Sequence, residues 1–254
     1  MMRFRLLRRA KRWLRSRAMR LQLNSSRVHL DEFARRAGSS LVAGARVLDA
    51  GAGNSVYRRH FSHVSYEAAD FLQVDKRYAQ MDYVCRLDDI PVSDGRFDLV
   101  LLTQVLEHLP EPEAVLLELN RVLRHDGKLW LSAPLFYPEH EQPYDFYRYT
   151  RFGFSYLLER AGFEVESIDW LEGYHGTVAF QLDWASRLAG RGPSDFGGGR
   201  LGLVTALAVN LSRPILFILA LLLYRSDVRS KYTARGYCKN YAIVAAKASP
   251  TPSS

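Results

Sequence analysis

The feature that most constrains the fold of this chain is a short strand that ends in a glycine-rich turn. Residues 47–55 read V-L-D-A-G-A-G-N-S. Glycines at Gly51 and Gly53 let the turn take positive φ and let a ligand approach the backbone closely. The pattern predicts a helix that starts near Asn54. A dinucleotide fingerprint would need a third glycine where the chain has Val56, so the turn favours a ligand without a pyrophosphate.

Strand-like and helix-like runs alternate after this turn. The run F-D-L-V-L-L at 97–102 is almost continuously apolar, which is typical of a strand covered on both faces of a parallel sheet. The alternation predicts an α/β fold, a Rossmann-like three-layer sandwich with a mainly parallel seven-stranded sheet. An apolar helical insertion precedes the last strand. The expected strands include 45–49, 65–70, 83–87, 97–102, 128–133, 163–170 and 240–247, and the expected helices include 31–37, 112–123 and 152–161.

Charge divides the chain into three parts. Residues 1–30 carry a net +10, residues 31–185 carry −10 and residues 186–254 carry +8. A uniformly basic nucleic-acid module would not divide in this way, whereas two basic ends predict surfaces that meet an anionic partner. The two cysteines, Cys85 and Cys238, form no C-x-x-C pair, and this favours a reducing cytosolic setting.

Residues 1–30 are predicted to form a basic amphipathic helix. Phe4, Leu7 and Leu14 share one face, and arginines fill most of the rest. This pattern fits binding in the plane of an anionic membrane. A solvated helix packed on its own domain, an RNA contact and a mitochondrial transit peptide stay open as alternatives. A secretory signal is not expected, because no uninterrupted apolar run follows the charges.

A second apolar segment, residues 201–224, lies inside the predicted insertion. It is long enough to span a membrane, but Arg213 and Pro214 interrupt it, and a central Arg costs roughly 2.5–3.5 kcal/mol on insertion scales. A single crossing would also separate the last strand from the sheet. We therefore expect a helix broken at Pro214 that lies in one leaflet, with a core helix or a dimer interface as the alternatives. The predicted parts are 1–30 (N-terminal helix), 31–170 (core), 171–239 (apolar and basic helical insertion), 240–247 (last strand) and 248–254 (disordered tail).

Four stretches in order resemble the class I S-adenosylmethionine-dependent methyltransferases, more narrowly the methyltransferase type 11 group. They are D-A-G-A-G at 49–53, Asp70 at the end of the second strand, L-D-D-I-P at 87–91, and F-D-L-V-L-L-T-Q-V-L-E-H-L at 97–109. The last continues into L-N-R-V-L-R-H-D-G-K-L-W-L-S-A-P. The resemblance covers residues 40–170 and the last strand. One departure is Arg86, where many relatives carry an acid near the adenine.

The resemblance implies S-adenosyl-L-methionine as the cofactor and assigns residues to it. Asp70 is expected to bind the ribose hydroxyls. Gly51 and Gly53 are expected to lie along the methionine part, and Asp49 to order the glycine turn. Asp75 is a competing acid, and we interpret it as a surface residue. The implied cofactor-binding residues are Asp49, Gly51, Gly53, Asp70, Leu87, Asp88 and Gln104.

The loop after the fifth strand, residues 134–150, is expected to face the methyl acceptor. Its H-E-x-P-Y-D-F-Y-R-Y-T stretch resembles a bacterial subgroup linked to surface-polysaccharide or lipid-linked glycan pathways. An oxygen acceptor needs a general base, and the alternative is that these side chains only fold the loop. The candidate catalytic residues are His140, Asp145 and His108, and the candidate substrate-binding residues are Glu141, Tyr144 and Arg148. In some relatives the residues that match Glu107 and His108 could hold a metal, but no third ligand is evident, so no metal site is predicted.

These features predict a methyltransferase that O-methylates a lipid-linked glycan or a similar amphiphile. The nucleic-acid amino-methyltransferase signature [DN]-P-P-[FY] is replaced by T-Q-V-L at 103–106, so nucleic acid is not the expected acceptor. The alternatives are a methyltransferase for a hydrophobic small molecule, such as a quinone precursor or lipid, and a membrane-tethered S-adenosylmethionine-binding protein without catalysis. The expected location is cytoplasmic, peripheral on the inner face of the cell membrane. The oligomeric state is not predicted.

Overall fold

The computed structural model describes residues 24–74 and 77–249, which form two compact units. The core unit consists of residues 26–174 and 233–249, and the helical unit consists of residues 175–232. The predicted N-terminal helix falls almost wholly outside the described residues, as does Asp75. Residues 25–30, which the sequence assigned to that helix, begin helix α2 of the core.

The core is built on a seven-stranded sheet in the order β3-β2-β1-β4-β5-β7-β6. All neighbours pair in parallel except β7, which runs antiparallel to both β5 and β6. The predicted fold class is therefore confirmed. The strands are β1 Arg46–Ala50, β2 Ser65–Asp70, β3 Tyr83–Val84, β4 Phe97–Thr103, β5 Leu123–Pro134, β6 Phe163–Trp170 and β7 Asn240–Lys247.

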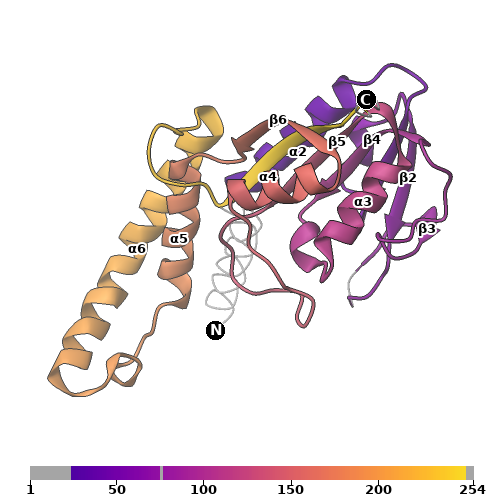
Figure 1. The fold of residues 1–254 in the computed structure, drawn as a ribbon. Coiled ribbons are helices and arrows are strands. Elements are labelled where there is room, and N and C mark those ends of the chain that lie inside the picture. Colours follow the sequence, from indigo (N-terminus) through magenta and orange to yellow (C-terminus); the bar gives the residue numbers. More distant parts are fainter. Residues whose placement is uncertain (1–23, 75–76, 250–254) are drawn as a thin grey trace, which may run out of the picture. The chain divides into compact units, whose positions relative to one another are not determined.

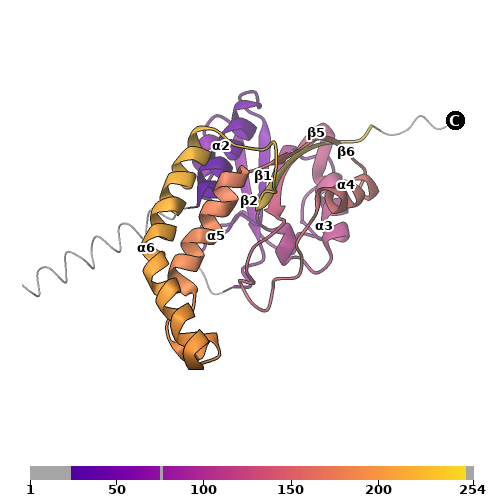
Figure 2. The same ribbon diagram turned by 90° about the vertical axis from the view of Figure 1, so that its left-hand side faces the viewer.

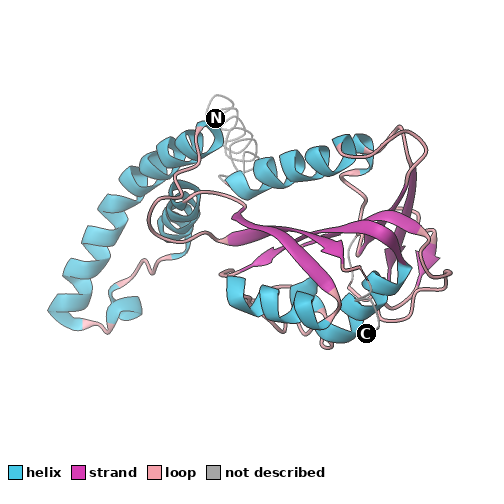
Figure 3. Cartoon of the chain, turned by 45° about the horizontal axis from the view of Figure 1, so that its top comes forward, coloured by secondary structure: helices cyan, strands magenta, loops and turns pink. Residues whose placement is uncertain are grey.

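Helices cover both faces of this sheet (Figure 3). Helix α2 (Ser25–Ser39) packs its apolar residues with one face, while α3 (Pro112–Val122) and α4 (Arg151–Arg160) pack with the other (Figure 1). Alternation along β1 shows why, since Val47 joins the α2 side and Leu48 joins the α3 side. Two separate apolar layers result, and the carboxyl ends of the parallel strands stay free to bind a ligand.

The expected helix after β1 is absent, and this prediction is wrong. The chain instead makes turns and a single 3-10 turn, Arg58–His60. Ser55 takes a left-handed conformation with φ 51°, which an α-helix cannot include. The described residues that follow β1 therefore bring no helix N-terminus to the glycine turn. Three strand lengths also differ: β3 ends at Val84, β4 extends to Thr103, and β5 extends back to Leu123.

A buried carboxylate ties the first helix of the core to its last strand. Glu172 is fully buried and accepts hydrogen bonds from the backbone amide of Asn240 at 2.7 Å and from the Ser26 hydroxyl at 2.6 Å. The Asn240 side chain donates to the same carboxylate at 3.1 Å. These bonds fix the start of β7 between β5 and β6, although the intervening chain forms the helical unit.

The helical unit is a hairpin of α5 (Tyr174–Leu188) and α6 (Gly199–Arg229), which lie side by side (Figure 2). The predicted break at Pro214 is wrong, since α6 continues through it. The neighbouring Arg213 donates hydrogen bonds to the carbonyls of Ser186 and Gly190, each at 2.9 Å, and so caps the end of α5. This anchorage holds the helical turn that Pro214 would otherwise weaken.

Most of the apolar side chains of α6 are exposed. Among the described residues, α6 is long and apolar enough to cross a membrane by length and composition, and only 11% of its most apolar window is buried. Leu211 and Ile215 are 74% and 66% exposed. The hairpin alone therefore leaves this face of α6 uncovered.

Candidate active site

A cavity of about 220 Å³ opens at the carboxyl ends of β1, β2 and β4. Residues from the cofactor side and from the acceptor side of the predictions line the same cavity. The predicted residues that line it are Gly51, Asp70, Leu87, Asp88, Gln104, His108, Glu141 and Tyr144. The predicted residues that do not line it are Asp49, Gly53, His140, Asp145 and Arg148.

The glycine turn needs its glycines for two different reasons. Gly51 has φ 72°, and a Cβ added there would lie 2.5 Å from a Val105 methyl. Gly53 has φ 54° with nothing within 4 Å of such a Cβ, so only its conformation calls for glycine. The turn therefore brings backbone against Val105 at the floor of the cavity and leaves space beyond Gly53.

Asp70 ends β2 and connects it to this turn. One carboxylate oxygen accepts from the Gly53 amide at 3.0 Å, and the other accepts from the Leu72 amide at 2.9 Å. An ionised carboxylate offers about four lone-pair positions. Two therefore remain for a vicinal diol that enters the cavity.

Asp49 lies on the opposite side of β1 from the cavity. It is buried and accepts a hydrogen bond from the Tyr66 hydroxyl. Burial raises the pKa of its carboxyl to about 7, and nearby Asp70 adds to the rise. Asp49 therefore contacts β2 through Tyr66, and its role in ordering the turn stays a prediction.

Leu87 and Asp88 form the wall where the adenine is expected. Leu87 is buried, and Asp88 pairs with Arg86 through two bonds, one of 2.8 Å. The hydrogen bonds from Arg86 lower the pKa of the Asp88 carboxyl. Arg86, the residue that departs from the family pattern, therefore forms an ion pair with Asp88, and the Arg86 side chain is largely exposed.

Gln104 follows β4 in a left-handed conformation, with φ 55°. Its backbone amide donates to the Ser132 carbonyl at 2.8 Å, and its side-chain amide approaches the Ser132 hydroxyl at 3.4 Å. Both contacts hold Gln104 at the end of the sheet, between the glycine turn and the loop after β5.

The loop after β5 folds back over the end of β4. His108 Nδ1 lies 2.5 Å from the Tyr144 carbonyl, which can only accept, so Nδ1 carries the proton and Nε2 is free. Burial lowers the pKa of His108, which favours the neutral imidazole. The His140 ring lies edge-on to the His108 ring, with centroids 4.6 Å apart.

Asp145 and Arg148 hold the loop together from inside. Two bonds of 2.7 Å join the guanidinium and the carboxylate, and Arg148 also donates to the carbonyls of Tyr137 and Pro138. Asp145 accepts the His140 backbone amide at 2.9 Å. Hydrogen bonding to Arg148 holds the pKa of Asp145 far below its usual range. Their contacts give both residues a positioning role in this loop.

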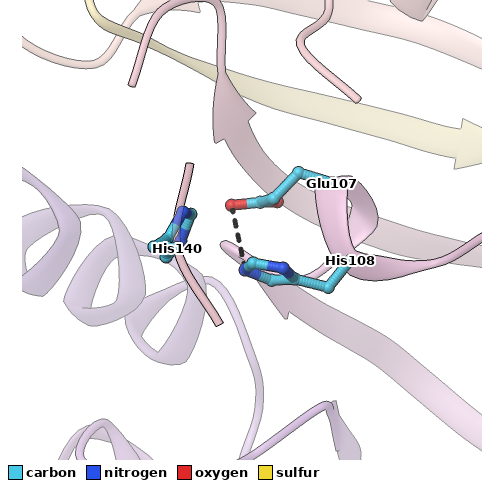
Figure 4. A group of neighbouring side chains, drawn as sticks. All are labelled: Glu107, His108 and His140. Carbon is cyan, nitrogen blue, oxygen red and sulfur yellow. Dashed lines mark ion pairs between the residues drawn. The ribbon is translucent and has the colours of Figure 1, made fainter. Parts of the chain in front are cut away.

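Glu107 is the residue whose importance the sequence understated. It is fully buried, and neither side-chain oxygen receives a hydrogen bond from another described residue. Burial raises the pKa of its carboxyl to about 8. His108 Nε2 lies 4.0 Å from one of its oxygens (Figure 4). The motif L-E-H-L named this residue, but only the folded loop shows its surroundings.

Sequence reasoning also missed several aromatic side chains of the cavity, namely Phe71, Tyr78 and Phe146. Phe71 is 46% exposed and directly follows Asp70, the partly buried last residue of β2. An exposed aromatic beside a strand-end acid was the available signal, because such a ring can stack on a planar ligand.

This cavity meets the requirements of S-adenosylmethionine. Asp70 has free acceptor positions for a ribose diol, Leu87 and Phe71 offer apolar surface for a purine, and the Gly51 turn leaves room for a chain that passes close to the backbone. The residues that would hold this cofactor therefore lie together around one space.

Comparison with known proteins agrees with this geometry. Residues 40–131 match the family model described as "Methyltransferase domain". A probable S-adenosylmethionine-dependent methyltransferase of Mycolicibacterium smegmatis is 32% identical over 155 residues, which is 56% of this chain and 60% of that protein. A ubiquinone biosynthesis O-methyltransferase of Xanthomonas oryzae pv. oryzae is 31% identical over 105 residues, 36% of this chain and 44% of that protein. The matches thus span less than two thirds of these relatives.

Solved structures share the fold at low sequence identity. A Burkholderia thailandensis 1,6-didemethyltoxoflavin-N1-methyltransferase with bound S-adenosylhomocysteine aligns with TM-score 0.52 at 16% identity, over 94% of this chain and 85% of that one. The [4+2]-cyclase SpnF aligns with TM-score 0.53 at 18% identity, over 86% and 81%. At this level of identity, these similarities establish the fold alone.

Proposed function

We propose that this protein, whose residues 40–131 match the methyltransferase domain model, is an S-adenosylmethionine-dependent enzyme that O-methylates an amphiphilic acceptor at a membrane surface. One observation carries the proposal. The cavity that holds Asp70 and the glycine turn also holds His108, Glu141 and Tyr144. Cofactor and acceptor groups therefore meet in one space, as transfer requires.

The cofactor supplies a methyl group on a positively charged sulfur, and the chain supplies position and a proton acceptor. Asp70, Leu87 and the Gly51 turn hold the nucleoside and the methionine part. His108 lines the cavity, and its Nε2 carries no proton because Nδ1 donates to the Tyr144 carbonyl. A neutral imidazole there can remove the proton of an acceptor hydroxyl as the oxygen is methylated.

The acceptor half of the cavity combines rings with polar groups. Tyr144, Phe146 and Glu141 line it beside His108. A sugar can stack on the aromatic rings of this lining and hydrogen-bond to its polar groups. The lining therefore supports a lipid-linked glycan as the acceptor. The likeness to a ubiquinone O-methyltransferase over 105 residues supports the second candidate, a quinone precursor or another hydrophobic small molecule.

Helix α6 supports the placement at a membrane. Many of its large apolar side chains are exposed, and Arg200, Arg225 and Arg229 stand near its two ends. Basic residues beside an apolar helix suit the boundary of an anionic bilayer. The chain enters the hairpin from β6 and leaves it into β7, so a helix that lies in one leaflet keeps both connections on one side. We place the protein on the cytoplasmic face.

Two measurements test this proposal in sequence. Isothermal titration with S-adenosylhomocysteine should show binding by the full chain, and no binding at high micromolar ligand would contradict the enzyme. Methyl-labelled S-adenosylmethionine is then incubated with a lipid extract and with a polysaccharide extract. Label in the lipid fraction that Asp70→Ala abolishes would support an amphiphile; label in polysaccharide alone would overturn it.

A further inference from the structure

Three potential metal ligands converge where the loop after β5 meets the turn after β4, and one of them, His108, lines the cavity. One ligand atom from each of Glu107, His108 and His140 lies within 4.8 Å of the others (Figure 4). The first two come from the turn after β4, and the third comes from the loop after β5, 32 residues later in the chain than His108. The third ligand that the sequence did not reveal is therefore present in the fold.

The buried carboxylate points independently to a bound cation. Glu107 is fully buried, and its two oxygens lack a hydrogen bond from any other described residue. A buried polar group without a partner is costly, and coordination of a metal is one of the few arrangements that offset this cost.

Both histidines are oriented as metal-binding histidines are. A ligating imidazole donates its second N–H to a carbonyl or a carboxylate, which fixes the ring and frees the other nitrogen. His108 Nδ1 meets the Tyr144 carbonyl at 2.5 Å. His140 Nδ1 lies 3.2 Å from the Pro138 carbonyl and 3.4 Å from Asp145. Each ring thus keeps Nε2 available.

We propose that Glu107, His108 and His140 bind one divalent first-row transition ion, with Zn²⁺ as the best fit. Two imidazoles and one carboxylate are the ligand set of catalytic zinc sites, which leave a position open for a further ligand. Zinc bonds of about 2.0–2.1 Å place tetrahedral ligands roughly 3.3 Å apart, so the three side chains close inward by about an ångström. His140 lies on a loop and can make this shift. Because His108 also lines the cavity, a bound ion would lie beside the acceptor, and His108 would then be a metal ligand in place of the proton acceptor proposed above.

The test measures metal binding directly and so does not depend on the proposed reaction. The full chain is stripped with a chelator, dialysed and titrated with ZnCl₂ by calorimetry, and Co²⁺ loading is followed by its visible ligand-field bands. We expect one site per chain. Loss of a ligand should weaken binding at least as much as the roughly 10–100-fold that loss of an outer partner costs. The variants are Glu107→Gln, His108→Ala and His140→Ala.

The matched control is His125→Ala, an exposed histidine near the opposite end of β5, which should bind Zn²⁺ like the wild type. S-adenosylhomocysteine titration of each variant reports whether the core is intact and tests the cofactor site separately. Wild-type protein that binds no Zn²⁺, or His140→Ala and Glu107→Gln variants that bind it as tightly as the control, would overturn the metal site. Either result leaves the methyltransferase proposal standing, with the histidines as a proton relay.

Discussion

The Asp70 carboxylate at the end of β2 accepts a hydrogen bond from the Gly53 amide in the turn after β1, with Oδ2 and N 3.0 Å apart. This bond ties the residue expected to hold the ribose to the turn expected to pass the methionine. These two parts of the expected cofactor site are therefore one structural unit, and a substitution in either should affect the other.

Replacement of Asp70 by Ala should weaken S-adenosylhomocysteine binding by about 1.5–3 kcal/mol, the range for a hydrogen bond to a charged group. Calorimetric titration measures the loss. Asp126→Asn is the control, because Asp126 is exposed at the far end of β5 and asparagine tolerates its left-handed φ of 63°. Equal affinity of Asp70→Ala and wild type would place the ribose elsewhere.

The two glycines of the turn should differ in their tolerance of alanine. Both substitutions incur the left-handed penalty of about 1–2 kcal/mol. Gly51→Ala adds a clash with Val105 worth roughly 1–3 kcal/mol, whereas Gly53→Ala meets open space. Urea unfolding should therefore rank Gly51→Ala as the less stable variant. Val105→Ala added to Gly51→Ala should recover the difference, and failure to recover it would mean that Val105 is not the obstacle.

Asp49 should make the folding free energy depend on pH. Its native pKa of about 7 lies above the unfolded value of about 3.9. Between these values the native state holds a proton that the unfolded chain releases, so the free energy of unfolding falls as pH rises, and the loss is complete above pH 7. Asp49→Asn stays neutral and still accepts from Tyr66. It should lack this decline, which we expect to be on the order of 2–4 kcal/mol between pH 4 and pH 8.

Urea unfolding at several pH values, without cofactor, measures this difference. Parallel pH profiles for the wild type and Asp49→Asn would show that the carboxyl of Asp49 titrates normally in the folded protein.

The Arg213 side chain should stabilise the end of α5. Arg213→Met removes the charged hydrogen bonds to the carbonyls of Ser186 and Gly190, so the last turn of α5 should lose about 1.5–3 kcal/mol of protection against amide hydrogen exchange. Arg225→Met, an exposed arginine on the same helix, is the control. Unchanged exchange in α5 would show that this cap is dispensable.

The strands were predictable because apolar runs between polar turns define them. The bounds of β2, β6 and β7 coincide with the expected ranges. The absence of a helix after β1 was not predictable, because the left-handed conformation of Ser55 depends on the turn around it.

The site was predictable only where it is local in the chain. The glycine turn and Asp70 stand at strand ends, and strand ends can be read from the sequence. The meeting of His108 with His140 depends on how the loop after β5 folds back, and the orphan oxygens of Glu107 depend on what buries them. The pairing of Asp145 with Arg148 is three residues apart, yet nothing in the sequence showed that it faces inward.

Attachment to a membrane should depend on the exposed face of α6. Leu211, Ile215 and Ile218 share this face and are 74%, 66% and 57% exposed. If they enter a bilayer, each contributes about 1.5–3 kcal/mol, so Leu211→Glu combined with Ile215→Glu should reduce co-flotation with anionic vesicles more than tenfold. Val42→Glu is the matched control, because Val42 is 77% exposed but lies in the core unit.

S-adenosylhomocysteine binding should be unchanged in all of these variants, since none of the substituted residues lines the cavity. An epitope added after Ser254 should be cleaved by protease outside the vesicles, as expected for a helix that stays in one leaflet. Protection of that epitope would mean that α6 crosses the bilayer. Wild-type protein that floats with neither anionic nor neutral vesicles would show that the α6 face is covered by protein instead, by the core or by a second copy of the chain.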